Sequence, residues 1–215
     1  MVSNLIRRRF ETREEWLEGR GEGIGASDAA AVVGMSPWKS SLALWREKVG
    51  KAAPKDLSGS SAVEQGNRLE PALRTLFAAM HPELAVEYHQ FDILSQAERP
   101  WLFATLDGEL TDGEGRRGIL EIKTSTPTNA AHWKDWDGQI PRHYFLQILW
   151  QLLSTGWDYV FLFACLFNRD GDATVRTYKF ERADCERDLD WLLPKAEVFW
   201  KHITDGTMPS QTLIL

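Results

Sequence analysis

Residues 159–167 of this 215-residue chain form an unbroken apolar run, YVFLFACLF. A strand of this composition is buried on both faces, because no alternating polar residue turns toward water. The segment that follows, TVRTYKFER at 174–182, alternates like a neighbouring strand. The run therefore predicts a sheet that other elements of the chain must cover on both sides.

Three longer segments have the periodicity of helices. Residues 140–156, IPRHYFLQILWQLLSTG, start near Pro141 and end at Gly156, and their apolar side chains point in most directions, which predicts a buried helix. Residues 61–80 carry apolar side chains at helical spacing, although Pro71 must kink or restart that helix. A last helix, residues 186–203, is expected to be interrupted by Pro194.

The first quarter of the chain predicts short helices separated by glycines. Thr12 and Glu15 have the spacing of a capping box. The segment GRGEGIGAS at 19–27 predicts a glycine loop, and Ser27 and Asp28 predict the N-cap of the alanine-rich turn after it. Residues 41–50 predict another short helix, and residues 51–61 a flexible connector.

Three strand-like runs lie between these helices, at residues 84–94, 101–110 and 118–124. The last two flank a turn that contains Asp112, Gly113 and Gly115, which predicts an antiparallel hairpin. The resulting order is helices, three strands, helix, two strands, helix. We therefore expect a mixed sheet flanked by helices, of class α/β or α+β, in one domain spanning residues 1–215 with a helical N-terminal segment, residues 1–60.

Composition excludes several kinds of protein. The formal net charge of −6 means that a polyanionic partner must be met by a local basic patch or by metal ions. Two cysteines are too few for a disulfide scaffold or a four-cysteine iron–sulfur cluster and suit a reducing cytoplasm. No apolar run approaches the length of about 18 residues expected of a membrane span, so we expect no membrane partner.

The predicted hairpin carries the residues with the clearest chemistry. Glu121 and Lys123 are two apart on one strand and therefore project to the same face. If the hairpin turns symmetrically about Glu114, Asp107 lies opposite Glu121, and two opposed carboxylates repel unless a cation lies between them. Magnesium accepts two carboxylates and a backbone carbonyl as part of its shell, and Lys123 could then orient or deprotonate an attacking water.

A plainer interpretation is also open for these residues. An E-x-K pair on a strand is most often an ordinary pair that faces solvent, and Asp107 would then belong to a turn. The motif gains weight because Glu70 lies on a preceding helix and Asp107 faces Glu121.

Five motifs in this order resemble the phage lambda exonuclease family of viral recombination nucleases. They are WLEGRGEGIGAS, GNRLEPALRTLF, ATLDG, LEIKT and YFLQ, and the resemblance spans roughly residues 16–167. It implies a PD-(D/E)XK, restriction-endonuclease-like core with a central mixed five-stranded sheet flanked by helices.

The resemblance also implies roles for individual residues. Asp107, Glu121 and the carbonyl of Ile122 would bind Mg²⁺, with Mn²⁺ able to substitute, and Glu70 would hold a water of the metal shell. Lys123 and Gln147 would hold the attacking water, and Tyr144 belongs to the same Y-x-x-Q motif as Gln147 and would contact substrate.

A second set of residues is implied to bind a terminal 5′-phosphate. Arg20, Ser27 and Thr105 match the family positions, so the N-terminal segment would carry the phosphate-binding loop. This chain has Asn129 where the best-known member has a second phosphate-binding arginine, so a weaker phosphate preference is expected.

The expected function is a metal-dependent exonuclease that degrades double-stranded DNA from its ends, 5′ to 3′, in phage-type recombination. The resemblance further implies a homotrimer, a single-strand annealing protein as partner, and the cytoplasm of a bacterial host. Two alternatives stay open: another PD-(D/E)XK endonuclease or repair nuclease, and a non-catalytic DNA-binding module. Among the tryptophans, we expect core positions for Trp45, Trp150, Trp191 and Trp200, and DNA contact by Trp38, Trp101, Trp133 and Trp136.

Overall fold

The computed structural model describes residues 4–54 and 59–209. Its centre is a five-stranded sheet in the order β3-β6-β7-β8-β9, in which β7 and β8 run parallel and the other neighbours antiparallel. These strands are β3 (Ala85–Glu87), β6 (Gly108–Thr111), β7 (Arg117–Ser125), β8 (Tyr159–Phe167) and β9 (Ala173–Glu181). The predicted mixed five-stranded sheet is therefore confirmed.

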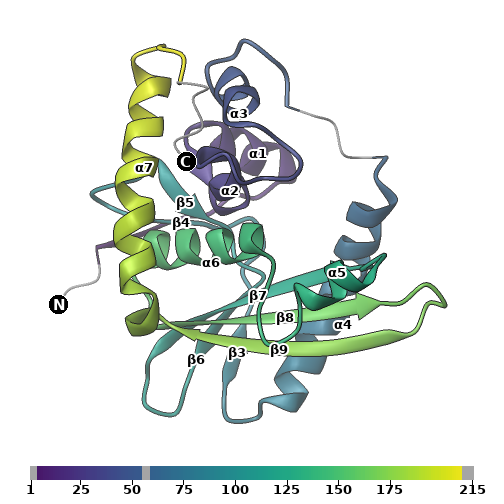
Figure 1. Ribbon diagram of the computed structural model, residues 1–215. Helices are drawn as coiled ribbons and strands as arrows, with labels where there is room; N and C mark the ends of the chain where they lie inside the picture. The colour runs from purple at the N-terminus through teal and green to yellow at the C-terminus, as the bar shows by residue number, and fades with distance from the viewer. Residues whose placement is uncertain (1–3, 55–58, 210–215) are drawn as a thin grey trace.

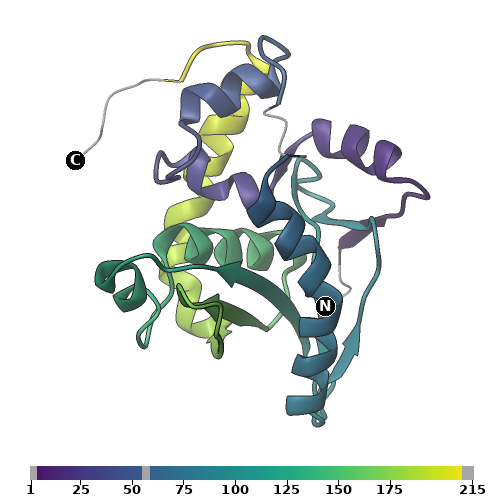
Figure 2. The ribbon, with the colours of Figure 1, turned by 90° about the vertical axis from the view of Figure 1, so that its right-hand side faces the viewer.

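Helices cover both faces of this sheet (Figure 1). Alternate residues of β8, such as Leu162, pack in the cluster formed with α6 (Arg142–Thr155) and α7 (Glu186–Thr204). The residues between them, such as Phe163, pack against Phe77 of α4 (Ser61–Met80). The apolar run is buried for this reason, and Figure 2 shows α4 and α6 running in different directions on the two sides of the sheet. Both α4 and α7 continue through their prolines.

A second, four-stranded sheet was not expected from the sequence. Its order is β1-β4-β5-β2, and its strands are β1 (Leu5–Arg8), β4 (Ile93–Gln96), β5 (Leu102–Ala104) and β2 (Ile24–Gly25). The predictions of single strands over 84–94 and 101–110 are therefore wrong. Each run contains two short strands, and the chain leaves one sheet and enters the other between them.

Buried ion pairs join the two sheets. Arg7 of β1 donates to both carboxylate oxygens of Glu109 of β6, at 2.6 and 2.8 Å, and to Asp92 at 2.7 Å. Arg117 of β7 donates to the same Glu109 at 2.7 Å. Since Glu109 and Asp92 are both buried, these arginines neutralise charges that would otherwise be costly inside the protein.

The N-terminal helices lie beside the small sheet. Helix α1 (Arg13–Gly21) has the predicted capping box between Thr12 and Glu15. The prediction that Ser27 and Asp28 cap the next helix is confirmed only for the position of Asp28, which is the N-cap residue of α2 (Ala29–Val32). Both residues belong to the 3₁₀ turn η1 (Ala26–Asp28), and the Asp28 side chain makes no capping bond to α2. Asp28 instead lies 3.5 Å from Lys39 and 3.7 Å from Lys48.

The remaining elements are α3 (Ser41–Lys48), α5 (Ala130–Lys134) and the turn η2 (Arg182–Cys185). The expected connector at 51–61 lies partly outside the described residues. Trp45 and Trp150 are core residues as predicted, but Trp191 is 41% exposed, and Trp136, expected at DNA, is buried. Among the described helices, none has both the length and the apolar character that crossing a bilayer requires.

Candidate functional site

The β6–β7 hairpin has the predicted register. Gly108 pairs with Leu120 and Glu109 with Ile119, so the next pair in the series is Asp107 with Glu121. β6 ends its pairing at Gly108, and the Asp107 carboxylate takes the place of the missing partner, because its Oδ2 accepts from the Ile122 N–H at 2.7 Å. The carbonyl of Ile122 points toward the same edge as its N–H, as in any β-strand. The two carboxylates and this carbonyl therefore meet at one point.

Glu121 is 2% exposed and is held by three donors. Its Oε1 accepts from Gln147 Nε2 at 2.6 Å and lies 2.5 Å from Lys123 Nζ. Its Oε2 accepts from Gln151 Nε2 at 2.5 Å. Both glutamines come from α6, where a spacing of four places them on one face. The buried carboxylate is consequently fixed in one orientation.

Lys123 is protonated in this setting. Burial lowers the pKa of Lys123, but the negative charges of Glu121 and Asp107 raise it by more, so its pKa lies above its ordinary value. Its ammonium group also lies 5.0 Å from the centre of the Tyr144 ring. Of the two expected tasks, orienting a water or deprotonating it, the raised pKa favours the first, in which Lys123 acts as a hydrogen-bond donor and a positive charge.

Glu70 reaches the same point from α4. Its Oε1 accepts from Arg74 Nη2 at 2.5 Å, and Arg74 Nε donates to the Asp107 carbonyl at 2.5 Å. Burial and the charges of Glu121 and Glu70 raise the pKa of Asp107 well above its ordinary value. Burial likewise raises the pKa of Glu70, against the opposing effect of Arg74. The three carboxylates therefore create a negative potential that their cationic neighbours do not fully offset.

The carboxylate and carbonyl oxygens at this point fit a hard divalent cation better than a soft one. No group of three or more His, Cys, Asp or Glu side chains in the described part of the chain is placed to hold a metal by itself. A site here would use Asp107, Glu121 and the Ile122 carbonyl and leave the other positions to water and substrate. Magnesium is commonly bound in this way, with few protein oxygens and several waters.

Arg20 and Ser27 lie together, as the resemblance implies. Arg20 Nη2 donates to Ser27 Oγ at 3.2 Å, and the guanidinium carbon lies 4.7 Å from the centre of the Trp16 ring. Burial lowers the pKa of Arg20, and within residues 4–54 and 59–209 no carboxylate forms an ion pair with it. Thr105 is tied to this group, because Trp16 Nε1 donates to Thr105 Oγ1 at 3.2 Å. A half-buried guanidinium without an ion-pair partner among the described residues, beside two hydroxyls, suits an anion.

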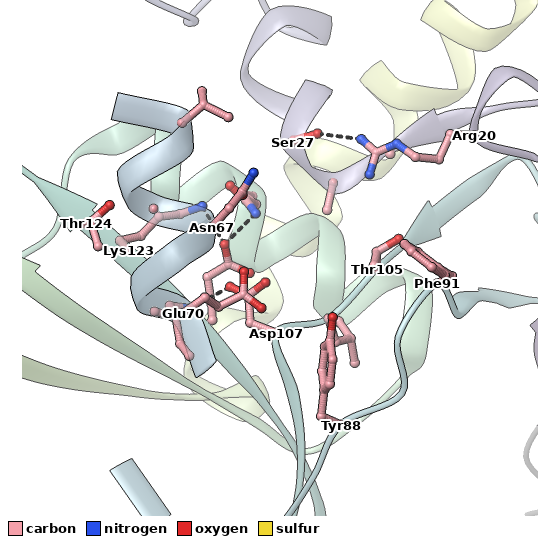
Figure 3. Close-up of a pocket in the computed structure, with 18 of the residues that line it drawn as sticks. Arg20, Ser27, Asn67, Glu70, Tyr88, Phe91, Thr105, Asp107, Lys123 and Thr124 are labelled. Carbon is pink, nitrogen blue, oxygen red and sulfur yellow. Dashed lines mark hydrogen bonds and ion pairs between the residues drawn. The ribbon is translucent and has the colours of Figure 1, made fainter. Parts of the chain in front are cut away.

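One cavity of about 390 Å³ connects the two groups (Figure 3). Of the predicted residues it is lined by Arg20, Ser27, Glu70, Thr105, Asp107, Glu121, Ile122, Lys123 and Gln147. Tyr144 does not line it and instead packs behind Lys123, against Trp38 and Trp136. Asn129 is also outside it and caps α5, where its Oδ1 accepts from the His132 N–H at 2.9 Å.

Sequence reasoning missed three residues at this site. Gln151 is placed four positions after Gln147, which was the available signal, but it stands in an otherwise apolar helix. Arg74 follows Glu70 by four positions, a spacing typical of a helical ion pair. Trp16 gave no signal, since a tryptophan at the start of an amphipathic helix predicts only packing.

The chain is similar to several known proteins. Residues 15–158 match the family model of the YqaJ-like viral recombinase domain. The uncharacterized protein YqaJ of Bacillus subtilis strain 168 is 32% identical over 204 residues, which is 93% of this chain and 59% of that protein. The chain thus spans about three-fifths of the length of this relative.

Two solved structures share the fold. The alkaline exonuclease LHK-Exo of Laribacter hongkongensis superposes with a TM-score of 0.69 at 19% identity, covering 90% of this chain and 93% of that one. A phage-related exonuclease of Haemophilus somnus 129PT gives a TM-score of 0.56 at 13% identity, covering 86% and 96%. The predicted likeness to phage recombination exonucleases is confirmed, and with two-thirds of its residues matched by the family model, the chain belongs to the YqaJ-like viral recombinase domain family.

Proposed function

We propose that this protein is a metal-dependent exonuclease that degrades double-stranded DNA from its ends, 5′ to 3′. The observation that carries the proposal is the single cavity that holds both an anion-binding group, Arg20 with Ser27, and a pair of opposed carboxylates, Asp107 with Glu121. A phosphodiester next to a chain end presents both features that such a cavity can bind, a terminal phosphate and a scissile one.

Mg²⁺, with Mn²⁺ able to substitute, would be held by Asp107, Glu121 and the Ile122 carbonyl. When bound it would supply positive charge to the scissile phosphate and to the oxygen that attacks it. The unbalanced carboxylates of the metal-free site support this assignment, because a divalent cation would offset their repulsion.

The side chains around this point have separate tasks. Lys123, protonated and donating toward Glu121, stabilises negative charge that develops on the phosphate. Gln147 fixes Glu121 and, from the cavity wall, orients the attacking water. Glu70 accepts a hydrogen bond from a second water, while Arg74 keeps the Glu70 carboxylate pointed into the cavity.

The arrangement of the anion group supports recognition of the 5′ end. Arg20 offers a fork of donors, Ser27 and Thr105 offer hydroxyls, and Thr105 precedes Asp107 by two residues in the chain. The alkaline exonuclease of Laribacter hongkongensis has also been solved in complex with dAMP. Asn129 lies outside the cavity, which agrees with a phosphate preference that depends on Arg20.

Membership of a viral recombinase family supports the larger setting. The protein would resect DNA ends for a single-strand annealing protein, in the cytoplasm of a bacterial host. With a net charge of −6, it would meet DNA in a channel built from several copies, of which a homotrimer is the expected form.

The decisive assay follows degradation of internally labelled linear duplex with either a 5′-phosphate or a 5′-hydroxyl, in Mg²⁺ and in EDTA, beside an Asp107→Asn control. The expected result is Mg²⁺-dependent release of nucleotides, faster from 5′-phosphate ends, by the unmodified protein only. Cleavage of closed circular duplex would instead identify an endonuclease. Binding of DNA ends without cleavage in Mg²⁺ would identify a DNA-binding module.

A further inference from the structure

Three aromatic side chains form one side of the cavity, and the proposed chemistry leaves them without a task. They are Trp16 of α1, and Tyr88 and Phe91 of the segment between β3 and β4, and we refer to them as the aromatic wall. Figure 3 shows Tyr88 and Phe91 on the side of the cavity away from Lys123. Tyr88 is 42% exposed, which is unusual for a ring that could have packed inside.

Arginine side chains contact two of these rings. The guanidinium carbon of Arg74 lies 3.6 Å from the centre of the Tyr88 ring, and that of Arg20 lies 4.7 Å from the Trp16 ring. Trp16 and Phe91 are 5.8 Å apart between ring centres, with their planes tilted by 41°. The wall is therefore fixed before any ligand arrives, which limits the entropy that binding would cost.

The backbone at Phe91 is unusual. Its φ is 63°, and it is the single non-glycine residue with positive φ in the part of the chain that the structure describes. A bulky side chain disfavours this conformation, which persists where the surroundings impose it and is frequent at functional sites. A glycine would relieve the strain, so the ring itself is what the position supplies.

The subsites around the wall define which ligand fits. One neighbour, Arg20 with Ser27, suits a phosphate, and the other, Asp107 with Glu121, suits a metal-assisted phosphoryl centre. A ligand that also offers a flat π-surface to the third side is a nucleotide. We infer that the aromatic wall stacks the nucleobase of the terminal nucleotide, an inference that rests on the proposed function and names its recognition step.

The aromatic wall should bind any nucleobase and not distinguish one base from another. The indole N–H of Trp16 is already donated to Thr105, and Phe91 has no polar group. The hydroxyl of Tyr88 remains, but it can donate or accept a hydrogen bond and so does not select one base. Stacking without edge contacts tolerates any base. We therefore expect dAMP and dTMP to bind within a few-fold of each other.

The test compares ligands with and without a base by calorimetry, in EDTA, on the whole protein. The ligands are dAMP, dTMP and 2-deoxyribose 5-phosphate, and the variants are Tyr88→Leu and Phe91→Gly. Stacking on an aromatic side chain changes affinity by about 5-fold to 150-fold. The unmodified protein should bind both nucleotides tighter than the sugar phosphate by a factor in that range, and each variant should reduce the factor.

Two controls make the result specific. Trp191→Leu removes a ring of matched exposure, 41%, that also carries a cation, with Lys195 Nζ at 4.6 Å, but lies outside the cavity on α7; it should change nothing. Arg20→Ala should weaken all three ligands, because each carries the phosphate that Arg20 would bind. The melting temperature of Phe91→Gly is measured beside binding to show that the variant is folded, since glycine relieves the positive φ but removes the ring contact with Trp16.

Equal binding of dAMP and 2-deoxyribose 5-phosphate would overturn the inference. So would a loss of affinity for all three ligands alike in Tyr88→Leu and Phe91→Gly. The proposed function fails separately: a protein that binds nucleotides through the wall but never cleaves DNA keeps the inference and loses the exonuclease. A protein that cleaves DNA ends with no dependence on a base keeps the exonuclease and loses the inference.

Discussion

Gln151 is completely buried, and its Nε2 lies 2.5 Å from Glu121 Oε2. The oxygen of the same amide, Gln151 Oε1, has no hydrogen-bond partner among the described residues. Leaving a buried acceptor unpaired is costly, and the hydrogen bond to Glu121 offsets that cost. We infer that the role of Gln151 is to orient the Glu121 carboxylate. Gln151 thus acts through Glu121, from a position where it cannot touch substrate.

Replacing Gln151 tests this role. Gln151→Leu keeps the volume of the side chain and removes the donor, so Glu121 should lose its fixed orientation. Residues that hold a metal ligand typically contribute about 10- to 100-fold to activity or metal affinity, and we expect a loss of that size. The control Gln96→Leu removes a glutamine that bonds the Ser154 carbonyl of the same helix, and it should keep full activity. Equal activity of both variants would refute the assignment.

The metal-free protein should become less stable as pH rises. The pKa of Asp107 is raised by burial and by Glu121 and Glu70, so its folded-state pKa exceeds the unfolded value of about 3.9. A raised pKa gives a stability contribution that is complete below about pH 4 and is lost as pH rises through the folded value. In EDTA at pH 8, Asp107→Asn should therefore melt higher than the unmodified protein, by about 2–4 °C per kcal/mol regained.

Magnesium supplies the complementary measurement for this prediction. Added Mg²⁺ should raise the melting temperature of the unmodified protein at pH 8 and leave Asp107→Asn nearly unchanged, since the variant lacks a charged ligand. Melting curves that are parallel in both proteins from pH 4 to pH 8 would show that Asp107 is not the group responsible.

Lys123 should be separable from metal binding. Lys123→Met removes the ammonium group 2.5 Å from Glu121, which competes with a cation for the same oxygen, so Mg²⁺ affinity should be equal or higher. Turnover should fall at least ~100-fold, because the phosphate loses a positive charge. Calorimetric titration with Mg²⁺ and single-turnover digestion give the two numbers. Weaker Mg²⁺ binding, of the size seen in Glu121→Gln, would make Lys123 part of the metal site.

Arg20 should govern the preference for phosphorylated ends. A charged hydrogen bond contributes about 1.5–3 kcal/mol, or roughly 10- to 150-fold, so Arg20→Ala should lose a preference of that order and act on 5′-hydroxyl ends at an unchanged rate. Arg13→Ala, an exposed arginine of the same helix, serves as the control. If Arg20→Ala slowed both kinds of end alike, Arg20 would bind duplex in general.

Arg7 should contribute to the stability of the fold and take no part in catalysis. Arg7→Met leaves the buried carboxylate of Asp92 without its main partner and Glu109 with Arg117 and the more distant His89, and breaking such a pair costs about 3–5 kcal/mol. Arg99→Met breaks an exposed pair with Glu197 and should cost less than about 1 kcal/mol. Urea unfolding measures both, and similar losses in the two variants would contradict the buried network.

Local patterns predicted what local interactions determine. The capping box at Thr12, the buried strand at 159–167 and the hairpin register that opposes Asp107 to Glu121 all follow from neighbouring residues and turn geometry. The placement of the two carboxylates was predictable for the same reason, because the hairpin alone brings them opposite each other.

Long-range packing accounts for most of the rest. The strand Leu5–Arg8 is short and rich in arginine, and only its pairing with β4, some 90 residues away, makes it a strand. Trp191 has the helical spacing of a core residue but is 41% exposed, with Lys195 beside its ring. The ring of Trp136 is buried against Tyr144 and Tyr178, which come from α6 and β9.

The segment from Thr105 to Asp107 is the stretch of chain that leaves the small sheet at β5 and enters the large sheet at β6. In the proposed function, a hydroxyl for the end of the substrate and a carboxylate for its hydrolysis are therefore two residues apart on one backbone, between two hydrogen-bonded strands. Two residues of chain limit how far their separation can change. The distance from a DNA end to the bond that is cut would thus be set by the covalent chain, and an insertion or deletion between these two residues should change the cutting position.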